Sequence, residues 1–316
     1  MPELVISLTS YPARINTVHL AIETILNQTL KADKVILWLA NEEFPNKEND
    51  LPDKLLALKS RGLEIDWCEN LKSYKKLIPT LRKYPDSIII TADDDLLYES
   101  NRVELLVNAY KKGKNNLYCH RITRICFDKN QKITNLSRSL YENGNNYFSP
   151  LIRKSSAFNK LSGGAMTLYP PRCFDDEIFN VDLFMSLAPT SDDIWFYLQA
   201  LRRGFKVRVV ENNWLTLNYI DGTQSIGLCH INDTNNNEIF NIHLNRVYEY
   251  YPELRQIFLE DAKENKKIIT FCKISKLLQK IFSVEKDSRG THTLIVICGI
   301  RMKIRCNGAI GGKTRS

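Results

Sequence analysis

Three consecutive carboxylates are the sharpest chemical feature of the sequence. Asp93, Asp94 and Asp95 come one residue after the apolar run IIIT at 88–91. Side by side they repel one another, and a divalent cation would relieve that repulsion. Carboxylate oxygens suit Mg²⁺ or Mn²⁺, which also bind the phosphate oxygens of a substrate. An arbitrary acidic triplet can also be a solvated turn. The element that precedes the triplet decides between a metal site and such a turn.

A second acidic pair, Asp192 and Asp193, opens the segment PTSDDIWFYLQALRRG at 189–204. This segment is predicted to be a helix, since Pro189 and Ser191 precede it and Gly204 ends it. Acidic residues at such a helix start are favoured by the helix dipole and by capping alone. In a cleft, however, a carboxylate here could take the proton of an attacking hydroxyl group. The sequence leaves both interpretations open.

Other residues could complete a ligand site around these carboxylates. Gly163 and Gly164 would let the backbone approach a ligand closely. Tyr11 could stack on a nucleotide base, and His230 could join a metal site from far along the chain. The basic side chains near predicted strand ends that could neutralise phosphate are Arg14, Lys75 and Lys76. Each also has an ordinary alternative, as a loop glycine, a rim aromatic, a lone histidine or a surface cation.

Alternating strands and helices would position these residues. The predicted strands are 4–9, 34–40, 62–68 and 87–91. The predicted helices are 17–28, 51–60, 73–83 and 100–112, and Pro79 should interrupt the third of them. This alternation predicts βαβ units and a mainly parallel sheet. Ligands bind beyond the carboxyl ends of such strands, which favours a functional role for the triplet.

The pattern weakens after residue 113. The segment 120–160 is polar and rich in Asn, and it is more typical of a substrate loop or small hairpin than of core. Order returns at GGAMTLYPP (163–171), at the helix 189–204 and at the strand FKVRVV that follows it. The eight cysteines are scattered without a C-x-x-C pair, so neither a zinc site nor a disulfide framework is expected.

The C-terminal tail has a different composition from the body. From residue 261 onward there are 13 Lys and Arg against 4 Asp and Glu, a net charge of +9 (13 − 4). The net charge of the whole chain is +8. The body is therefore near neutral, which argues against a nucleic-acid partner. Segment 266–282 is predicted to be a basic amphipathic helix, and THTLIVICGIRMKIRC (291–306) a strand or hairpin. Contact with an anionic membrane surface and packing on the catalytic domain are both consistent with such a tail.

Taken together, the sequence resembles the nucleotide-sugar glycosyltransferases of the GT-A fold, in particular a bacterial subgroup (family 2-like) that builds capsule or lipopolysaccharide glycans. The resemblance covers about residues 3–255. The matching segments are VISLTSYPARI (5–15), LKSYKKLIPTL (71–81), IIITADDDLLY (88–98), GGAMTLYPP (163–171) and PTSDDIWFYLQALRRG (189–204). It implies an α/β fold with a Rossmann-like, mainly parallel sheet and flanking helices at 1–258, and a small basic extension at 259–316.

The resemblance also implies roles for single residues. Asp93 and Asp95 correspond to the ends of the D-x-D motif and would hold Mn²⁺ or Mg²⁺. Asp93 and Asp94 would also contact the nucleotide. Asp193 or Asp192 falls where inverting members keep their catalytic carboxylate. Members often carry a late third metal ligand, for which His230 is a candidate although no motif fixes it. The residues matching the nucleoside, phosphate and sugar segments are Thr9, Tyr11, Arg14, Lys75, Lys76, Gly163 and Gly164.

The expected function is transfer of a sugar from a nucleotide donor, with uridine as the implied base, to a glycan or lipid-linked glycan acceptor. Inversion is favoured by the acidic pair at 192–193. A sugar nucleotidyltransferase is one alternative, although SLTSYPAR lacks the glycines of a triphosphate loop. A non-catalytic glycan-binding protein is another, and the intact triplet argues against it. Without a signal peptide or a run of about 18 apolar residues, the expected location is cytoplasmic, with peripheral contact at the inner membrane face as an option.

Overall fold

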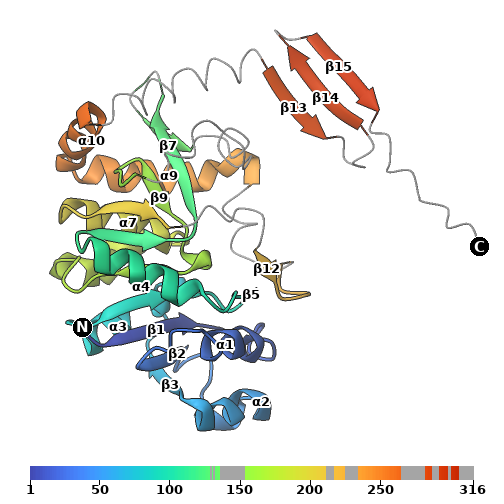
Figure 1. Cartoon of the computed structure of the whole chain (residues 1–316), viewed down its shortest axis with the longest axis vertical. Helices are drawn as coiled ribbons and strands as arrows, with labels where there is room; N and C mark the ends of the chain where they lie inside the picture. Colours follow the sequence, from blue (N-terminus) through green and yellow to red (C-terminus); the bar gives the residue numbers. More distant parts are fainter. Residues whose placement is uncertain are drawn as a thin grey trace, which may run out of the picture. The chain divides into compact units, whose positions relative to one another are not determined.

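The computed structural model describes residues 1–128, 130, 132–135, 154–210, 217–224, 234–264, 282–286, 292–297 and 300–305. The chain divides into two compact units, Met1–Glu264 and Asn265–Ser316. The candidate functional residues belong to the first unit, whose helices and strands are labelled in Figure 1.

The first half of the chain forms the predicted parallel βαβ layers. Strands β1 (Leu4–Thr9), β2 (Lys34–Ala40), β3 (Leu63–Cys68) and β4 (Ile88–Thr91) match the four predicted strands within one residue. Helix α1 (Val18–Leu26) connects β1 to β2. The strands pair in parallel, with Val5 opposite Lys34 and Leu4 opposite Ile88. The apolar runs of these strands are buried, as a sheet covered on both faces requires.

Two of the predicted helices are broken into shorter pieces. Between β2 and β3 lie the 3₁₀ turn η1 (Lys47–Asp50), helix α2 (Asp53–Leu56) and the 3₁₀ turn η2 (Ala57–Arg61). Between β3 and β4 lie the 3₁₀ turn η3 (Lys72–Lys76) and helix α3 (Ile78–Lys83). The expected interruption by Pro79 is confirmed, since this residue lies in the first turn of α3 and the helix cannot extend back through it.

The central sheet has seven strands in the order β11-β6-β10-β4-β1-β2-β3. Strands β6 (Asn116–Cys119) and β11 (Lys206–Val209) are parallel to each other. Strand β10 (Thr167–Tyr169) lies between β4 and β6 and is antiparallel to both. The predicted fold class is therefore confirmed as α/β, with a mainly parallel, Rossmann-like sheet of the GT-A kind. The 3₁₀ turn η5 (Gly163–Ala165), just before β10, consequently shares the sheet edge where β4 ends.

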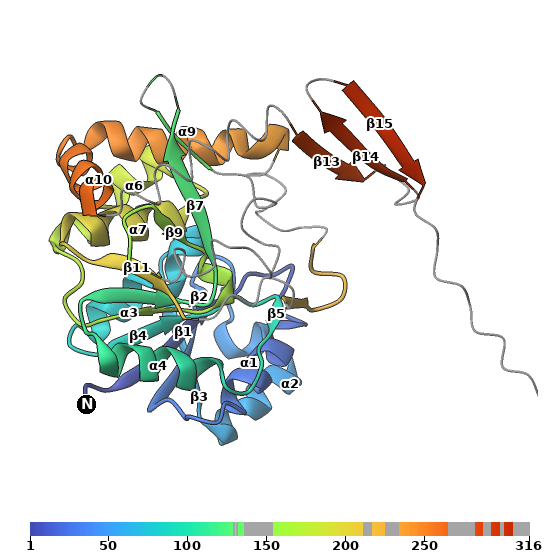
Figure 2. The same ribbon diagram turned by 45° about the horizontal axis from the view of Figure 1, so that its top comes forward.

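Helices cover both faces of the sheet. Side chains of α1 and of α4 (Arg102–Lys112) pack on Leu4, Ile6 and Leu8 of β1 to form the main core. Helix α7 (Asp192–Arg202) is the expected helix at 189–204 and is buried along nearly its whole length. It is covered by α9 (Thr234–Tyr250) and α10 (Glu253–Glu264), which lie at the end of the unit away from β3 (Figures 1 and 2). The shorter elements are η6 (Asp176–Phe179), α6 (Val181–Leu187), β5 (Leu96–Leu97) and β12 (Asn218–Tyr219).

The expectation of a polar loop at 120–160 is corrected in part by the structure. Strand β7 (Ile122–Phe127) pairs antiparallel with β8 (Ile133–Asn135) and with β9 (Asn159–Leu161). β7 and β8 form the small hairpin, but Ile122 and Ile125 are fully buried. Thr123 and Arg124 lie between these two apolar residues and are buried too, so the segment lacks the alternation of apolar and polar residues that marks a half-buried strand.

The second unit contains an antiparallel sheet of three strands, β13 (Phe282–Lys286), β14 (His292–Ile297) and β15 (Ile300–Arg305). The hairpin predicted at 291–306 corresponds to β14 and β15. The predicted amphipathic helix lies outside the described residues, apart from Phe282, which begins β13. The first unit includes all of α10 and so extends beyond the expected boundary at residue 258. In the part of the chain that the structure describes, no helix is long and apolar enough to span a membrane.

Candidate active site

Four segments meet at the carboxyl edge of the central sheet. The triplet Asp93–Asp95 follows β4, and the turn η5 precedes the antiparallel strand β10. The start of α7 brings Asp192 and Asp193, and the end of η3 brings Lys76. Ion pairs and hydrogen bonds connect all four segments, so residues from the predicted metal, base, phosphate and sugar groups lie together.

Asp94 is the anchoring member of the triplet. Its carboxylate is buried and accepts hydrogen bonds from Ser10 Oγ at 2.6 Å and from Arg14 Nη1 at 2.7 Å. Both partners follow β1, so Asp94 ties the chain after β4 to the chain after β1. The structure thus places Asp94 in contact with protein groups, whereas the resemblance put it among the nucleotide contacts.

Asp95 is held by the same arginine. Arg14 Nη1 lies 3.1 Å from its Oδ2, and Gln224 Nε2 donates to that oxygen at 3.1 Å. Arg14 also donates to the Thr223 carbonyl at 3.2 Å, so two segments far along the chain, the triplet and the segment of Thr223, orient it. Burial, and after it the neighbouring charge of Asp93, raise the pKa of Asp95 to about 6. A bound cation would offset both causes, because it favours the charged form of the carboxylate.

Asp93 is the most exposed carboxylate of the triplet, at 31% against 7% for Asp94 and 13% for Asp95. Its Oδ1 lies 2.7 Å from Lys76 Nζ, and the same ammonium lies 3.1 Å from Asp192 Oδ2. Burial opposes the charged form of Lys76, but attraction to Asp192 and Asp93 outweighs it and raises the pKa of Lys76 well above its ordinary value. Lys76 is thus a buried, charged bridge between the triplet and the start of α7.

The glycine pair makes room for the carboxylates on either side of it. Gly163 N donates to Asp193 Oδ2 at 2.9 Å, and a Cβ built on Gly163 would overlap Asp193 Oδ1. A Cβ on Gly164 would lie 2.7 Å from Asp93 Oδ2, closer than real Cβ atoms approach. The close approach inferred for these glycines is therefore to acidic side chains of the protein itself. One turn contacts both Asp93 and Asp193.

Asp193 differs from its neighbour in its partners. Burial, and after it the charge of Asp192, raise the pKa of Asp193 to about 6, although Lys76 and Lys160 act in the opposite direction. Its Oδ1 has no hydrogen-bond partner among the described residues. Asp192 instead forms the ion pair with Lys76. Asp192 and Asp193, which the sequence could not tell apart, thus differ in their tertiary contacts.

The remaining predicted residues lie at the end of β1, just after it, or after β3. Thr9 Oγ1 donates to the Trp38 carbonyl at 2.8 Å, which joins β1 to β2. Lys75 is buried and its Nζ lies 2.5 Å from Glu43 Oε2. The ring centroid of Tyr11 lies 5.8 Å from the Arg14 guanidinium. These residues flank the triplet, as expected for nucleoside contacts, but Thr9 and Lys75 already have partners within the protein.

A closed metal site is not present among the described residues, since no group of three or more His, Cys, Asp or Glu side chains could hold an ion. His230 lies outside those residues. Asp93 and Asp95 nevertheless fit an open site, because Mg²⁺ and Mn²⁺ take further ligands from substrate phosphates and water. Arg14 and Lys76 make the ion pairs with the triplet and with Asp192, which leaves an excess of negative charge for a cation.

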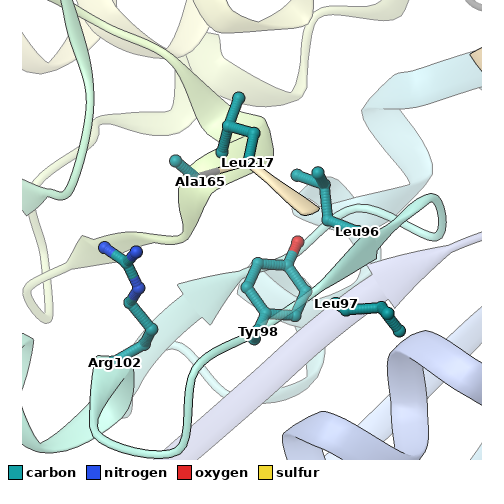
Figure 3. A pocket seen from close by; sticks show the side chains of 6 residues that line it. All are labelled: Leu96, Leu97, Tyr98, Arg102, Ala165 and Leu217. Carbon is teal, nitrogen blue, oxygen red and sulfur yellow. The ribbon is translucent and has the colours of Figure 1, made fainter. Parts of the chain in front are cut away.

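A small pocket lies beside the triplet (Figure 3). It is lined by Leu96, Leu97, Tyr98, Arg102, Ala165 and Leu217. None of the predicted site residues lines it, so it is separate from the carboxylate cluster. The phenol of Tyr98 lies between the pocket and the triplet, where its oxygen contacts Asp93 and Gly164.

Sequence reasoning missed three residues that hold this site together. Ser10 and Gln224 bind carboxylates of the triplet, and Tyr98 binds the backbone of Asp93 and of Gly164. Tyr98 is the terminal residue of the run LLY that follows the triplet, which is a weak signal. Nothing in the sequence marks Gln224, because its contact with Asp95 spans 129 positions.

Comparisons with known proteins give a fold likeness only. No protein-family model and no curated protein matches the chain. One similar solved structure is CMP:2-keto-3-deoxy-manno-octonic acid synthetase complexed with CTP, with 14% identity, a TM-score of 0.37, and coverage of 66% of this chain and 89% of that one. Another is GalNAc-T7 with UDP, GalNAc and Mn²⁺, with 11% identity, a TM-score of 0.43, and coverage of 66% and 42%. The match thus spans less than half of the second protein, and at such levels neither assigns a substrate or a residue role to this chain.

The raised pKa of Asp193 predicts a stability effect. Because folding favours its protonated form, this residue lowers stability as the pH rises from about 4 through its folded pKa of about 6. Asp193→Asn should therefore raise the free energy of unfolding at pH 7.5 by about 3 kcal/mol in metal-free buffer, with a gain that shrinks as the pH falls towards about 4. Urea denaturation measures this. The matched control, Asp192→Asn, should lower stability, since Lys76 loses a partner. Equal effects of the two variants would contradict the assignment.

Proposed function

We propose that this chain is a metal-dependent, inverting glycosyltransferase. It transfers a sugar from a UDP-sugar donor to a glycan acceptor in the synthesis of a bacterial capsule or lipopolysaccharide. The observation that carries the proposal is the single turn at Gly163–Gly164. Gly163 of this turn binds the carboxylate of Asp193, and Gly164 packs against the carboxylate of Asp93. The pKa of Asp193 is about 6. A base and a candidate metal ligand thus share one edge of a sheet of the kind that binds nucleotides.

The residues support a division of roles. A cation held by Asp93 and Asp95 would offset the charge that develops on the leaving diphosphate. Thr9, Tyr11 and Lys75 would face the nucleoside, beyond the ends of β1 and β3. Lys76, already charged and buried, would add a fixed positive charge near the diphosphate. The glycine turn would border the donor sugar.

Asp193 is the better candidate for the base. A carboxylate with a pKa of about 6 is ionised at neutral pH and is still basic enough to take a proton. Asp192 is already engaged in the ion pair with Lys76, which leaves it less available to an acceptor hydroxyl. Asp193 Oδ1 would accept the hydroxyl proton as the acceptor oxygen bonds to the anomeric carbon and the bond to the diphosphate breaks. This oxygen is buried against Gly163, so we expect the turn to shift when an acceptor binds.

The donor class is tested first by thermal stability. Binding of UDP or a UDP-sugar should raise the melting temperature, and Mn²⁺ should enlarge the increase. In Asp95→Asn the Mn²⁺-dependent part should disappear, because a ligand oxygen is replaced by an amide nitrogen or its weaker carbonyl. The matched control is Glu64→Gln, which removes a carboxylate on β3 away from the triplet. This variant should behave as wild type.

Either of two results would contradict the donor assignment. A well-folded wild-type protein that responds to no nucleotide, with or without Mn²⁺, would favour the non-catalytic alternative. Release of pyrophosphate in place of a nucleoside diphosphate, on incubation with a sugar phosphate and UTP or CTP, would favour the nucleotidyltransferase alternative.

The role of Asp193 is tested by kinetics. Asp193→Asn should retain metal-dependent UDP binding but lose turnover by roughly 10²–10⁴-fold, the usual contribution of a general base. In wild type, kcat/KM should fall as the pH drops below about 6, since the base is then protonated. In Asp192→Asn this acid limb should move to lower pH, because the charge that helps to raise the pKa of Asp193 is removed. Wild-type turnover in Asp193→Asn would place the base elsewhere.

We also propose that the basic C-terminal unit contacts an anionic membrane surface, which would place a cytoplasmic enzyme near a lipid-linked acceptor. The supporting observation is the charge of the tail, with 13 Lys and Arg against 4 Asp and Glu from residue 261 onward. The last strand also reads IRMKIR, which alternates apolar and basic residues. Such composition suits adsorption to anionic headgroups without crossing the bilayer.

The tail proposal predicts vesicle binding. The full chain should co-float with vesicles containing phosphatidylglycerol and not with pure phosphatidylcholine, and salt should weaken the binding. A variant that ends at Glu264 should stay unbound while keeping its nucleotide response. Failure of the full chain to bind either vesicle at low salt would reject the membrane role.

A further inference from the structure

The phenol of Tyr98 connects the two halves of the carboxylate site. Its oxygen accepts a hydrogen bond from Asp93 N at 2.7 Å and donates one to the Gly164 carbonyl at 2.9 Å. The Asp93 carbonyl also lies 3.3 Å away, but a phenol has a single proton and the shorter distance favours Gly164. One buried hydroxyl thus joins residues from two segments, and its contact with Gly164 spans 66 positions of sequence.

The two groups that Tyr98 joins belong to different parts of the proposed mechanism. Asp93 is a candidate metal ligand, and Gly164 packs against its carboxylate. Gly163, the next residue in the turn, donates its N–H to Asp193. The connection therefore runs from Asp93 through Tyr98 to the turn, and from the turn to the base.

Tyr98 is itself held in place. It is 8% exposed, and its backbone N–H donates to Thr24 Oγ1 of α1 at 3.1 Å. Its ring lies among Leu96, Ala165 and Leu217 at the pocket beside the triplet (Figure 3). A phenol fixed at both ends in this way can transmit position, because its hydroxyl has little freedom to follow a displaced turn.

We propose that Tyr98 is a positioning residue that keeps the metal ligand Asp93 in register with the turn that carries Asp193. This inference rests on the proposed function. Phenylalanine at this position would fill the same space but would leave the Asp93 N–H and the Gly164 carbonyl without this partner. Groups that orient a metal ligand from outside the ligand shell typically contribute about 10–100-fold to metal affinity or activity.

The test is Tyr98→Phe, compared with Tyr118→Phe. Tyr118 is also fully buried, and its phenol also donates to a backbone carbonyl, that of Gly113 before β6. Isothermal titration with UDP is carried out in Mn²⁺ and in EDTA. In Tyr98→Phe the increase in UDP affinity that Mn²⁺ produces should fall by about tenfold, while the affinity in EDTA stays unchanged. Tyr118→Phe should keep the full Mn²⁺ effect even if its melting temperature falls as much.

Three outcomes would overturn the inference. A wild-type Mn²⁺ effect in Tyr98→Phe would show that the phenol does not position the ligand. An equal loss in Tyr118→Phe would show that only general stability was affected. A wild-type protein whose UDP binding does not respond to Mn²⁺ would remove the proposed function and this inference with it, whereas the first two results leave the proposed function standing.

Discussion

Repulsion among five carboxylates at one edge of the sheet is the constraint on which the rest of this site depends. Asp93, Asp94, Asp95, Asp192 and Asp193 are brought together by β4 and α7, and folding must offset their mutual repulsion. Arg14 does so for Asp94 and Asp95, and Lys76 does so for Asp93 and Asp192. Burial, and after it the charge of a neighbouring carboxylate, still raises the pKa of Asp95 and of Asp193 to about 6. A functional site can retain such unfavourable charge because a ligand supplies the missing countercharge.

The antiparallel strand β10 turns this cluster into a site with two sides. Were β10 parallel to its neighbours, the turn before it would lie at the opposite edge of the sheet. As it is, Gly163 and Gly164 reach the carboxylates of Asp193 and Asp93, and only residues without a Cβ can approach so closely. Tyr98 then fixes the turn to the triplet. Strand direction, glycine content and one phenol thus act together to set the distance between the proposed metal ligand and the proposed base.

The proposed base, Asp193, is supported by the late helices α9 and α10. Helix α7 is buried from Ile194 to Leu201, and α9 and α10 cover it. Ser191, just before α7, pairs with His243 of α9. In α10 the fully buried Asp261 accepts from Ser156 Oγ and Ala157 N, next to β9. The late helices therefore brace both the start of α7 and the strand that leads into the glycine turn, and a carboxylate held this way is preorganised at the sheet edge.

The sequence alone determined β1 to β4, the start and end of α7, the break at Pro79 and the position of the triplet, because these follow from hydrophobic periodicity and from turn chemistry within a few residues. It did not reveal β6, which has only four residues, or the buried strand β7, and both lie in polar surroundings. Nor could it show that protein groups hold Asp94, or separate Asp192 from Asp193. Those differences depend on Ser10, Arg14, Lys76 and Gly163, which come into contact with the carboxylates only in the folded chain. Local sequence fixes which residues can carry charge and where strands end, whereas burial and long-range pairing set the environment of each carboxylate.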